Sequence, residues 1–370
     1  MIRKRLAEDL RHALGSVASY NLRRQLGMGS KKRQPQVCYG MLQVPPPESR
    51  TFGGMVKVQR LQTMYPNEIA SANILYLVSS CLPRGAVAIA RDAIRAGCRL
   101  VLNQNGVAYP GWYGSGWEHV NAPMRSLMSM AHHIFYQSEF CRTGADRFLG
   151  DPTCPTEVLY NCVDMGKFQP LKERGNTGEL TLLLGGTQYQ KYRLMIALET
   201  LAMVRAELPG ARLVVTGSLS WQADTGDALA QAQHRCMELD IEDAVTFHGP
   251  YLQAEAADLY RTADILLHTK YNDPCPGLVV EAMACGLPVV YSDSGGVPEL
   301  VGPEAGIGVP APLDWEEDHL PHPRNLADAV CKVAVNVDRY AEAARQRAVD
   351  LFDINPWFQR HREVFEMILA

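Results

Sequence analysis

Two carboxylates bracket a short glycine-containing segment in the second half of the chain. Asp273 and Glu281 flank Gly277 and Leu278 within DPCPGLVVEAMACGLPVVYSDSGGVPELVG, residues 273–302. Glycine permits close approach of the backbone to a ligand, and the exposed N–H groups at the start of a helix favour an anion. Carboxylates are good acceptors for the hydroxyls of a sugar or a ribose. The segment therefore suits a nucleotide-sugar; the alternative is a loop whose acid caps a helix.

The elements around this segment alternate between short apolar runs and helix-like stretches. The runs that we interpret as strands are ELTLLLGG, ARLVVTGS, DAVTFHG, ADILLHT and LPVVYSD. RLMIALETLAMVRAELPG has the pattern of an amphipathic helix, and EAMACG is interpreted as a second helix. Such alternation indicates parallel β-α-β units in a doubly wound sheet, in which ligands lie outside the carboxyl ends of the strands.

The first half of the chain repeats this organisation. VCYGMLQV, residues 37–44, is interpreted as a strand that ends at three prolines, and ANILYLVSS, RLVLNQNG and HHIFYQS as further strands. GAVAIARDAIRAG and the stretch that ends at Met64 are interpreted as helices, and the last stretch, from Arg339, as helices broken at Pro356. KERGNTGE is a plausible linker between the halves, near residue 170. The residues expected near one crevice are Gly53, Gly54, Asn103, Gln104, Asn105 and Ser138.

The composition restricts the class of protein. The apolar fraction of 47% and the charged fraction of 21% are typical of a soluble globular protein. The net charge of −4 argues against nucleic acid as a partner. The ten cysteines are scattered without a CxxC pair, which favours reduced thiols in a cytoplasmic protein over structural zinc. No apolar run approaches the roughly 18 residues of a membrane span.

Segment 273–302 resembles the signature of the retaining glycosyltransferases with the GT-B fold, family four. That signature is an acid, seven residues and then Glu, followed by AMACG-PVV and S/D-x-GG-x-x-E. VLYNCVDMGKFQP at 158–170, LTLLLGGTQYQKYRLMIALETL and TFHGPYLQAEAADLYRTADILLHT follow in the family's order. The resemblance spans roughly residues 37–360.

The resemblance implies two doubly wound Rossmann-like domains that face each other across a cleft. The acceptor domain would comprise 35–168 together with a helix at 355–370 that crosses back, and the donor domain would comprise 169–354. The implied activity is transfer of a sugar from a nucleotide-diphosphate sugar to a glycan, a lipid-linked or another acceptor, with retention of configuration, as in polysaccharide biosynthesis. Two alternatives stay open: a non-catalytic nucleotide-sugar binding protein and a same-fold nucleotide-sugar epimerase.

The resemblance also implies roles for particular residues. Glu281 should accept hydrogen bonds from the ribose, Asp273 should contact the transferred sugar, and Lys191 should neutralise the departing phosphate. Asn105 is the third residue that we expect at the reacting centre. The other residues expected to bind the donor are Gly53, Gly54, Gly186, Arg193, Gly217, Tyr251 and the amides of Gly277, Leu278 and Val279. No cofactor or metal ion is implied, because a cation and amides hold the diphosphate and no Asp-x-Asp cluster is present.

Three positions depart from the family's pattern. Asp273 stands where Glu is usual, so its side chain is one methylene shorter. Gly186 stands where Arg is common, and Arg193 is either its substitute or an exposed helix arginine. Asn105 stands where many members have His; asparagine can hydrogen-bond a sugar hydroxyl but cannot act as a general base.

Two segments outside the signature carry weaker hypotheses. YPGWYGSGW, residues 109–117, would stack on an acceptor sugar or pack on its own domain. Residues 1–34 hold nine Lys or Arg against two acidic residues, with Leu6, Leu10, Ala13 and Leu14 at helical spacing. This extension would lie on the anionic inner face of a membrane as a peripheral helix, or remain a solvated extension or a helix packed on the first domain.

Overall fold

The computed structural model divides the chain into two compact units. It describes residues 21–23, 25, 34–49, 51, 53–171 and 179–370. The first unit comprises the described residues up to Tyr160 together with Asn355–Ala370, and the second comprises Asn161–Ile354. All of the linker KERGNTGE except Glu179 lies outside the described residues, as does nearly all of the basic extension 1–34 with its expected amphipathic helix.

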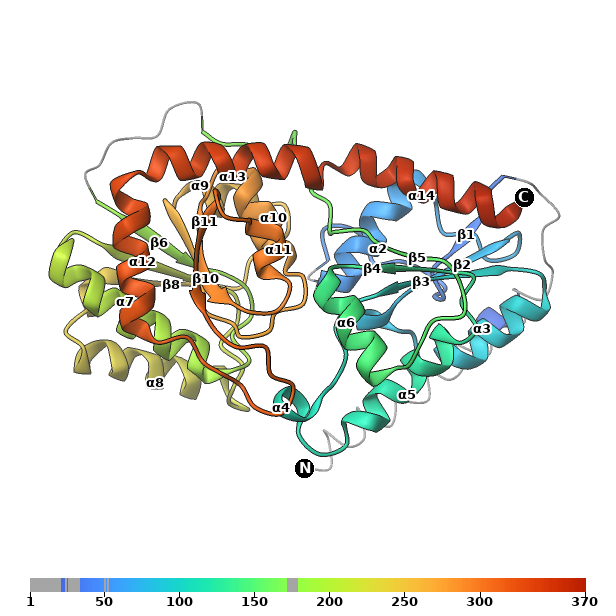
Figure 1. The fold of residues 1–370 in the computed structure, drawn as a ribbon, viewed down its shortest axis with the longest axis horizontal. Helices are drawn as coiled ribbons and strands as arrows, with labels where there is room; N and C mark the ends of the chain where they lie inside the picture. Colours follow the sequence, from blue (N-terminus) through green and yellow to red (C-terminus); the bar gives the residue numbers. More distant parts are fainter. Residues whose placement is uncertain (1–20, 24, 26–33, 50, 52, 172–178) are drawn as a thin grey trace. The chain divides into compact units, whose positions relative to one another are not determined.

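The first unit is built on a five-stranded parallel sheet whose central strands are apolar and buried. Its strands follow chain order: β1 (Val37–Cys38), β2 (Ile74–Val78), β3 (Arg99–Gln104), β4 (His133–Tyr136) and β5 (Thr156–Val158). On one face lie α2 (Gly53–Met64) and α14 (Ile354–Leu369); on the other lie α3 (Ala86–Arg95), α5 (Trp117–Met128) and α6 (Glu139–Phe148) (Figure 1). The strand order does not reverse within this sheet, although helices cover both of its faces.

The apolar run 37–44 forms less strand than its composition predicts. Only Val37 and Cys38 pair with β2. Gly40 has a φ of 73°, which is outside the strand region. The N–H of Tyr39 donates to Asn67 Oδ1 at 3.1 Å, so the backbone leaves the sheet for a side-chain partner. The prediction of a strand to residue 44 is therefore wrong beyond Cys38.

Helix α14 belongs to the core of the first unit although it comes last in the sequence. His361 is fully buried: its Nε2 lies 3.1 Å from the Tyr76 hydroxyl and its Nδ1 lies 2.8 Å from the Trp357 carbonyl. Burial lowers the pKa of His361 to about 3, so the ring is neutral; Nδ1–H donates to the carbonyl and Nε2 accepts from Tyr76. Arg360 forms a two-pronged ion pair with Glu157, at 2.7 and 3.0 Å, beside β5.

The break between the last two helices differs from the prediction. Helix α13 (Val337–Phe352) ends before Asp353, and α14 begins at Ile354. Pro356 lies inside the first turn of α14, where the missing N–H of proline would have had no intrahelical partner. The predicted break at Pro356 therefore lies at Asp353 instead.

The second unit contains a six-stranded parallel sheet with a reversal of strand order. The order is β11-β10-β9-β6-β7-β8. The strands are β6 (Thr181–Leu184), β7 (Arg212–Thr216), β8 (Val245–Gly249), β9 (Ile265–His268), β10 (Val289–Asp293) and β11 (Gly306–Pro310). The order reverses between β6 and β9, as expected of a doubly wound sheet. The predicted strands of this half are confirmed, and β11 was not predicted.

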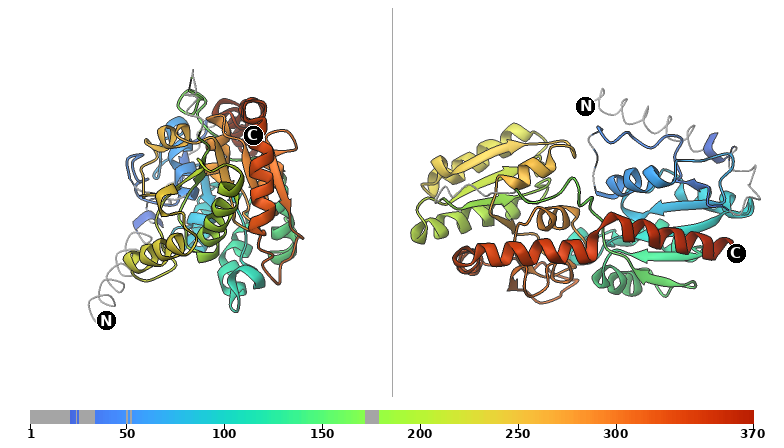
Figure 2. Two further views of the ribbon diagram at one scale, coloured as in Figure 1. Left: turned by 90° about the vertical axis from the view of Figure 1, so that its left-hand side faces the viewer. Right: turned by 90° about the horizontal axis from the view of Figure 1, so that it is seen from above.

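Helices cover both faces of the second sheet. On one face, α7 (Lys191–Glu207) packs between α8 (Thr225–Glu238) and α12 (Pro323–Val335) (Figures 1 and 2). On the other, α10 (Gly277–Ala284) packs against α9 (Ala256–Arg261), α11 (Val297–Val301) and α13. Buried side chains of α7, α8 and α12 form one core with the sheet residues.

The second unit begins earlier than the expected boundary at 168/169. Residues 161–168 are attached to it by backbone hydrogen bonds and by Arg345. The Val163 N–H donates to the Phe352 carbonyl at 2.8 Å, and Arg345 Nη1 donates to the Phe168 carbonyl at 2.7 Å. The segment 158–170 is thus divided at Tyr160/Asn161.

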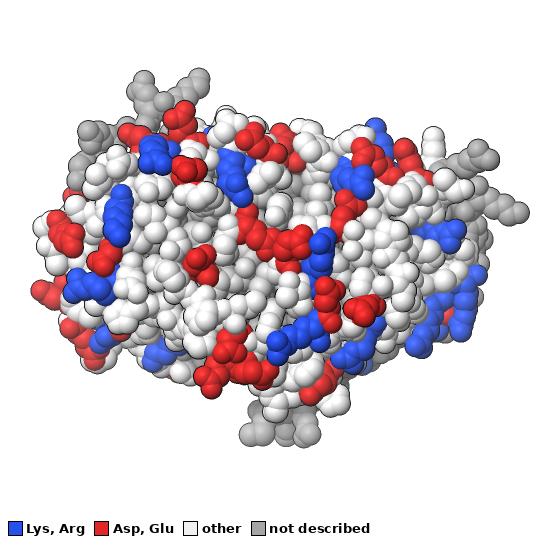
Figure 3. All heavy atoms as spheres, in the orientation of Figure 1, with Lys and Arg blue, Asp and Glu red and all other residues white. Residues whose placement is uncertain are grey.

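The surface of the first unit is basic over α3. This helix carries Arg91 and Arg95, and Figure 3 shows Lys and Arg side chains gathered over it at the lower right. Across the described part of the chain, no helix has both the length and the apolarity that crossing a bilayer would require.

Candidate functional site

The reversal of strand order places two loops of the second unit at one end of its sheet. Strands β6 and β9 are neighbours, and the chain leaves them in opposite directions across the sheet. Such a switch point is where ligands bind in open α/β sheets. The loop 185–190 follows β6, and the loop 269–276 leads from β9 into α10. Most of the predicted site residues lie on these two loops or at the helix starts behind them.

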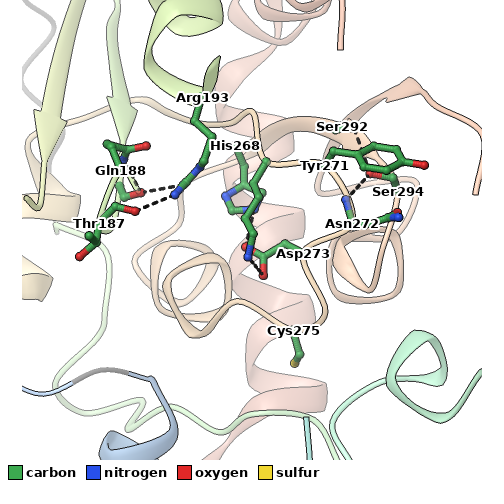
Figure 4. Close-up of polar contacts among 12 residues, drawn as sticks. Thr187, Gln188, Arg193, His268, Tyr271, Asn272, Asp273, Cys275, Ser292 and Ser294 are labelled. Carbon is green, nitrogen blue, oxygen red and sulfur yellow. Dashed lines mark hydrogen bonds and ion pairs between the residues drawn. The ribbon is translucent and has the colours of Figure 1, made fainter. Parts of the chain in front are cut away.

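The loop after β6 is held by a buried arginine. Arg193 is only 3% exposed; its Nη1 donates to the Thr187 carbonyl at 2.8 Å and its Nη2 to the Gly185 carbonyl at 3.3 Å. Figure 4 shows the guanidinium reaching back to Thr187. The interpretation of Arg193 as an exposed helix arginine is therefore wrong. Lys191, by contrast, is exposed at the first position of α7.

Two predicted glycines allow this loop to pack against its neighbours. Gly186 has a φ of 82° and Gly217, after β7, a φ of 87°, a region that favours glycine. A Cβ atom at Gly217 would lie 2.3 Å from the Gly186 carbonyl oxygen, and one at Gly186 would lie 3.1 Å from Leu278 Cδ2. Gly186, which stands where arginine is common, thus has a conformation and surroundings that suit glycine.

The Asp273 carboxylate lies between two partners from its own loop. Its Oδ2 is 3.1 Å from His268 Nε2, and its Oδ1 is 3.0 Å from Lys270 Nζ. Figure 4 shows His268 and Asp273 side by side. Sequence reasoning missed both partners, because a lone histidine and a lone lysine at the end of a strand have no periodic signal. Their proximity to Asp273 in ADILLHTKYND was the available hint.

This cluster sets the protonation of its members. Burial alone would raise the pKa of the Asp273 carboxyl, but the Lys270 ammonium and the His268 ring hold it well below its usual range. Burial opposes the charge on Lys270, yet the Asp273 carboxylate raises the pKa of Lys270 above its ordinary value. Burial lowers the pKa of His268. At neutral pH the cluster therefore holds an Asp273–Lys270 ion pair and a neutral His268 that donates from Nε2.

The backbone of the Asp273 turn is held from three sides. Asn272 has a φ of 48°, its N–H donates to Ser294 Oγ at 2.9 Å, and its Nδ2 donates to the Asp314 carbonyl at 3.0 Å. The Gly296 N–H donates to the Asp273 carbonyl at 2.9 Å. These bonds fix the turn in a conformation that is uncommon for a residue other than glycine.

Glu281 lies one turn into α10 and is buried. Its Oε1 accepts from Gln253 Nε2 at 2.7 Å, and its Oε2 accepts from the Tyr260 hydroxyl at 3.0 Å. The Tyr251 hydroxyl lies 3.3 Å from that of Tyr260, so the predicted residues Glu281 and Tyr251 belong to one chain of hydroxyls. Sequence reasoning missed Gln253 and Tyr260.

The start of α10 offers two backbone donors rather than three. Gly277 and Leu278 occupy the first turn, whose N–H groups have no intrahelical acceptor. The Val279 N–H already donates to the Pro276 carbonyl at 3.1 Å. Of the three amides expected to face a ligand, Val279 therefore already has a partner, and those of Gly277 and Leu278 stay candidates.

A cavity of about 250 Å³ lies in the second unit, where β7 and β8 end. Val215, Leu219, Leu229 and Phe247 give it apolar walls, and Gly217, Gly249 and Pro250 bring backbone to it. Apolar walls with backbone groups among them suit a flat heterocycle whose edge forms hydrogen bonds.

Of the predicted residues of the first unit, Gly54 and Asn105 have structural partners. Gly53 and Gly54 begin α2; Gly53 is exposed, whereas a Cβ at Gly54 would lie 2.4 Å from Ser80 Oγ. Asn105 follows β3, its N–H donates to Ser79 Oγ at 2.8 Å, and its Oδ1 accepts from the Gly106 N–H at 2.7 Å. The Asn105 amide oxygen is thus used within its own turn.

A buried polar cluster lies where β3 and β4 of the first unit end. Asn103 Oδ1 accepts from Lys57 Nζ at 3.1 Å and from Gln137 Nε2 at 2.7 Å. Asn103 was expected at this crevice, whereas Lys57 and Gln137 were missed. In the segment 109–117, Tyr109 packs against Phe148, while Trp112 and Tyr113 are 42% and 48% exposed. Tyr109 therefore suits packing on its own domain, whereas Trp112 and Tyr113 stay available for stacking on a sugar.

Metal ligands do not gather in the described part of the chain. There, no group of three or more His, Cys, Asp or Glu side chains has the geometry to hold an ion.

Comparison with known proteins finds a family model that is similar to the second unit. Residues 169–318 match the family model described as "Glycosyl transferases group 1". The D-inositol 3-phosphate glycosyltransferase of Mycolicibacterium smegmatis is 36% identical over 155 residues, which are 39% of this chain and 34% of that protein. That of Mycobacteroides abscessus is 36% identical over 121 residues, or 31% of this chain and 27% of that protein. The matched part of this chain thus spans about a third of these relatives.

Solved structures resemble both units together. The Anabaena protein HepE in complex with UDP and glucose has a TM-score of 0.64 at 18% identity, covering 86% of this chain and 84% of that one. Sucrose-phosphate synthase from Thermosynechococcus elongatus has a TM-score of 0.62 at 18% identity, covering 80% of this chain and 74% of that one. At this identity the likeness shows the fold, two parallel α/β sheets of the GT-B type.

Proposed function

Because residues 169–318 match the group 1 glycosyltransferase family model and the chain has the GT-B fold, we propose that it transfers a sugar from a nucleotide-diphosphate sugar with retention of configuration. The observation that carries the proposal is the pair of buried carboxylates at α10. Asp273 and Glu281 are 8% and 5% exposed, and they flank a helix start with two available amides. Carboxylates that bind hydroxyls on either side of an anion site match a nucleotide-sugar.

Each part of the donor has a candidate position in the second unit. The nucleobase would enter the cavity beside Gly217 and Gly249, and the ribose would bind Glu281 near Tyr251. The diphosphate would meet the amides of Gly277 and Leu278 and the loop of Gly186 that Arg193 holds. The transferred sugar would lie at Asp273. The Anabaena relative holds UDP and glucose, so UDP-glucose is the first donor to test.

The mechanism that we propose relies on stabilising the leaving group. As the bond from the sugar to the diphosphate breaks, negative charge grows on the phosphate oxygens. Lys191 and the two α10 amides would stabilise that charge more in the transition state than in the ground state, without a metal ion or another cofactor. Arg193 would act indirectly, by holding the Gly185 and Thr187 carbonyls and so the shape of the loop.

The acceptor would bind the first unit. Asn105 would offer an amide, and Trp112 and Tyr113 would offer exposed aromatic faces for a sugar, while the buried cluster of Asn103, Lys57 and Gln137 would support the strand ends from within. A glycan or lipid-linked acceptor fits these groups. With a lipid-linked acceptor, the basic extension 1–34 would dock this cytoplasmic enzyme on an anionic membrane surface.

One observation favours a second candidate, a nucleotide-sugar binding protein without turnover. Asp273 already accepts from two partners, and the Asn105 amide oxygen is used in its own turn. Incubation of the purified protein with radiolabelled UDP-glucose separates the two candidates. Slow release of free glucose supports an enzyme, whereas tight binding without release supports a binding protein.

Replacing Glu281 with Gln should weaken nucleotide binding by about 10- to 100-fold, since a hydrogen bond to a charged acceptor is worth about 1.5–3 kcal/mol. The substitution keeps the size of the side chain, and Gln253 and Tyr260 can still bind it. Calorimetric titration with UDP measures the effect. Unchanged affinity, with an unchanged melting temperature, would remove Glu281 from the donor site.

Replacing Lys191 with Ala should lower kcat about 100-fold or more while UDP binds within a few-fold of wild type, because the cation acts mainly on the transition state. Lys191 is exposed at the start of α7, so the fold should tolerate the change. Lys332→Ala, on the exposed surface of α12, is the matched control. Wild-type turnover in Lys191→Ala would exclude the residue from the mechanism.

A further inference from the structure

Lys270 is a partly buried cation for which the proposed donor site has so far given no role. It follows β9 and keeps 14% of its side chain exposed, and Asp273 keeps 12%. The ammonium donates to Asp273 Oδ1 at 3.0 Å, and Tyr189, whose ring centre lies 5.5 Å away, is a second hydrogen-bond partner. An ammonium has three donors, and each carboxylate oxygen has two lone pairs. One ammonium donor and several carboxylate lone pairs therefore remain, so the pair keeps both donating and accepting capacity where it is exposed.

The charges around Lys270 nearly cancel. Asp273 opposes it directly, Asp318 is a second nearby carboxylate, and Arg193 is a second nearby cation. His268 completes the cluster as a neutral ring. A ligand at this edge meets an ion pair of no net charge, so the edge favours an uncharged polar group over an anion.

We propose that the Lys270–Asp273 pair recognises one hydroxyl of an uncharged transferred sugar, an inference that rests on the proposed donor site. The hydroxyl accepts from Lys270 Nζ and donates to Asp273, so a single sugar position satisfies both groups. Asp273 is shorter than the glutamate usual at its place, and the long side chain of Lys270 extends the polar edge beside it. Lys270 is thus a specificity-determining residue and does not replace the phosphate cation absent at Gly186.

Two properties distinguish this role from that of a counter-ion for Asp273. A counter-ion affects stability and the position of Asp273, whereas a residue that binds the hydroxyl also discriminates between sugars and leaves nucleotide binding unchanged. A site built to hydrogen-bond a hydroxyl also rejects ligands that cannot satisfy it, often by several orders of magnitude. The pair should therefore discriminate between sugars on one and the same nucleotide.

The experiment measures dissociation constants for UDP, UDP-glucose and UDP-glucuronic acid by calorimetry. The proteins are wild type, Lys270→Met, Lys270→Arg and the surface control Lys332→Met. Wild type should bind UDP-glucose at least 10-fold more tightly than UDP-glucuronic acid. Lys270→Met should weaken the binding of UDP-glucose by about 10- to 100-fold and leave the dissociation constant of UDP within about two-fold of wild type. Lys270→Arg should recover part of the loss, and the control should match wild type.

The other outcomes separate the two levels of the argument. Equal loss of UDP and UDP-glucose in Lys270→Met, or no loss of either, overturns the role of Lys270 as a reader of the sugar. So does equal binding of both sugars by wild type, a test that remains if Lys270→Met fails to fold. If wild type binds UDP and all UDP-sugars with the same affinity, this inference alone fails. If wild type binds no nucleotide or nucleotide-sugar, including those of GDP and ADP, the proposed function fails with it.

Discussion

Replacing Asp273 with Ala should lower the free energy of unfolding by about 3–5 kcal/mol, because the substitution leaves the buried Lys270 without its partner. The His268 ring loses its acceptor in the same step. Activity should fall below detection, since the side chain at the transferred sugar is gone. Urea unfolding at pH 7 measures the stability, and initial rates with UDP-glucose measure the activity.

The control for Asp273→Ala removes both charges. In Asp273→Ala/Lys270→Met neither member of the ion pair is left without its partner, so most of the lost stability should return while activity does not. The wild-type pair should also weaken in acid. The pKa of Asp273 is depressed in the folded state, so its stabilisation is present above the unfolded pKa, about 4, and is lost as the pH falls further. If Asp273→Ala unfolds at the same urea concentration as wild type, the ion pair contributes nothing to stability.

Replacing Gly217 with Ala should have the second large effect. It should lower the free energy of unfolding by about 3 kcal/mol or more and abolish nucleotide binding. The new Cβ would lie 2.3 Å from the Gly186 carbonyl oxygen, and the φ of 87° is unfavourable for alanine. The loop after β6 must move, and with it the backbone beside the cavity. Thermal unfolding and UDP titration measure the two effects.

Gly249→Ala is the matched control for Gly217→Ala. Gly249 lines the same cavity and has a similar φ of 78°, but a Cβ there would meet no atom within 4 Å. Gly249→Ala should therefore lower the free energy of unfolding only by the backbone strain of about 1–2 kcal/mol. If the two variants behave alike, the close approach of Gly217 to Gly186 is not what constrains the position.

Much of the fold follows from the sequence because continuous apolar runs identify buried parallel strands. ANILYLVSS and ADILLHT are such runs, and both form the predicted strands. The failures have local causes. The run 37–44 stops pairing after Cys38 because of a turn at Gly40 and a long-range bond to Asn67, which no local pattern encodes. Pro356 was interpreted as a break, although a first helical turn accepts proline.

The site was less predictable than the fold. Order along the chain identified Glu281 and Asp273, but not the donors that surround them. Gln253 and Tyr260 reach Glu281 from a different loop and helix, so only the tertiary structure brings them together. Whether Arg193 is buried or exposed could not be read from α7, since the answer depends on two loop carbonyls that need a donor. The roles of the individual residues remain predictions that the variants above test.

The place of α14 bears on the order in which the chain can fold during synthesis. The helix supplies Trp357, His361 and Phe365 to the core of the first unit, yet 161–354 intervenes in the sequence. The ribosome therefore finishes the entire second unit before this part of the first core exists. Until then, the apolar surface around Tyr76 and Phe135 that α14 covers has no partner from the chain, which is the kind of exposed surface that favours aggregation during folding.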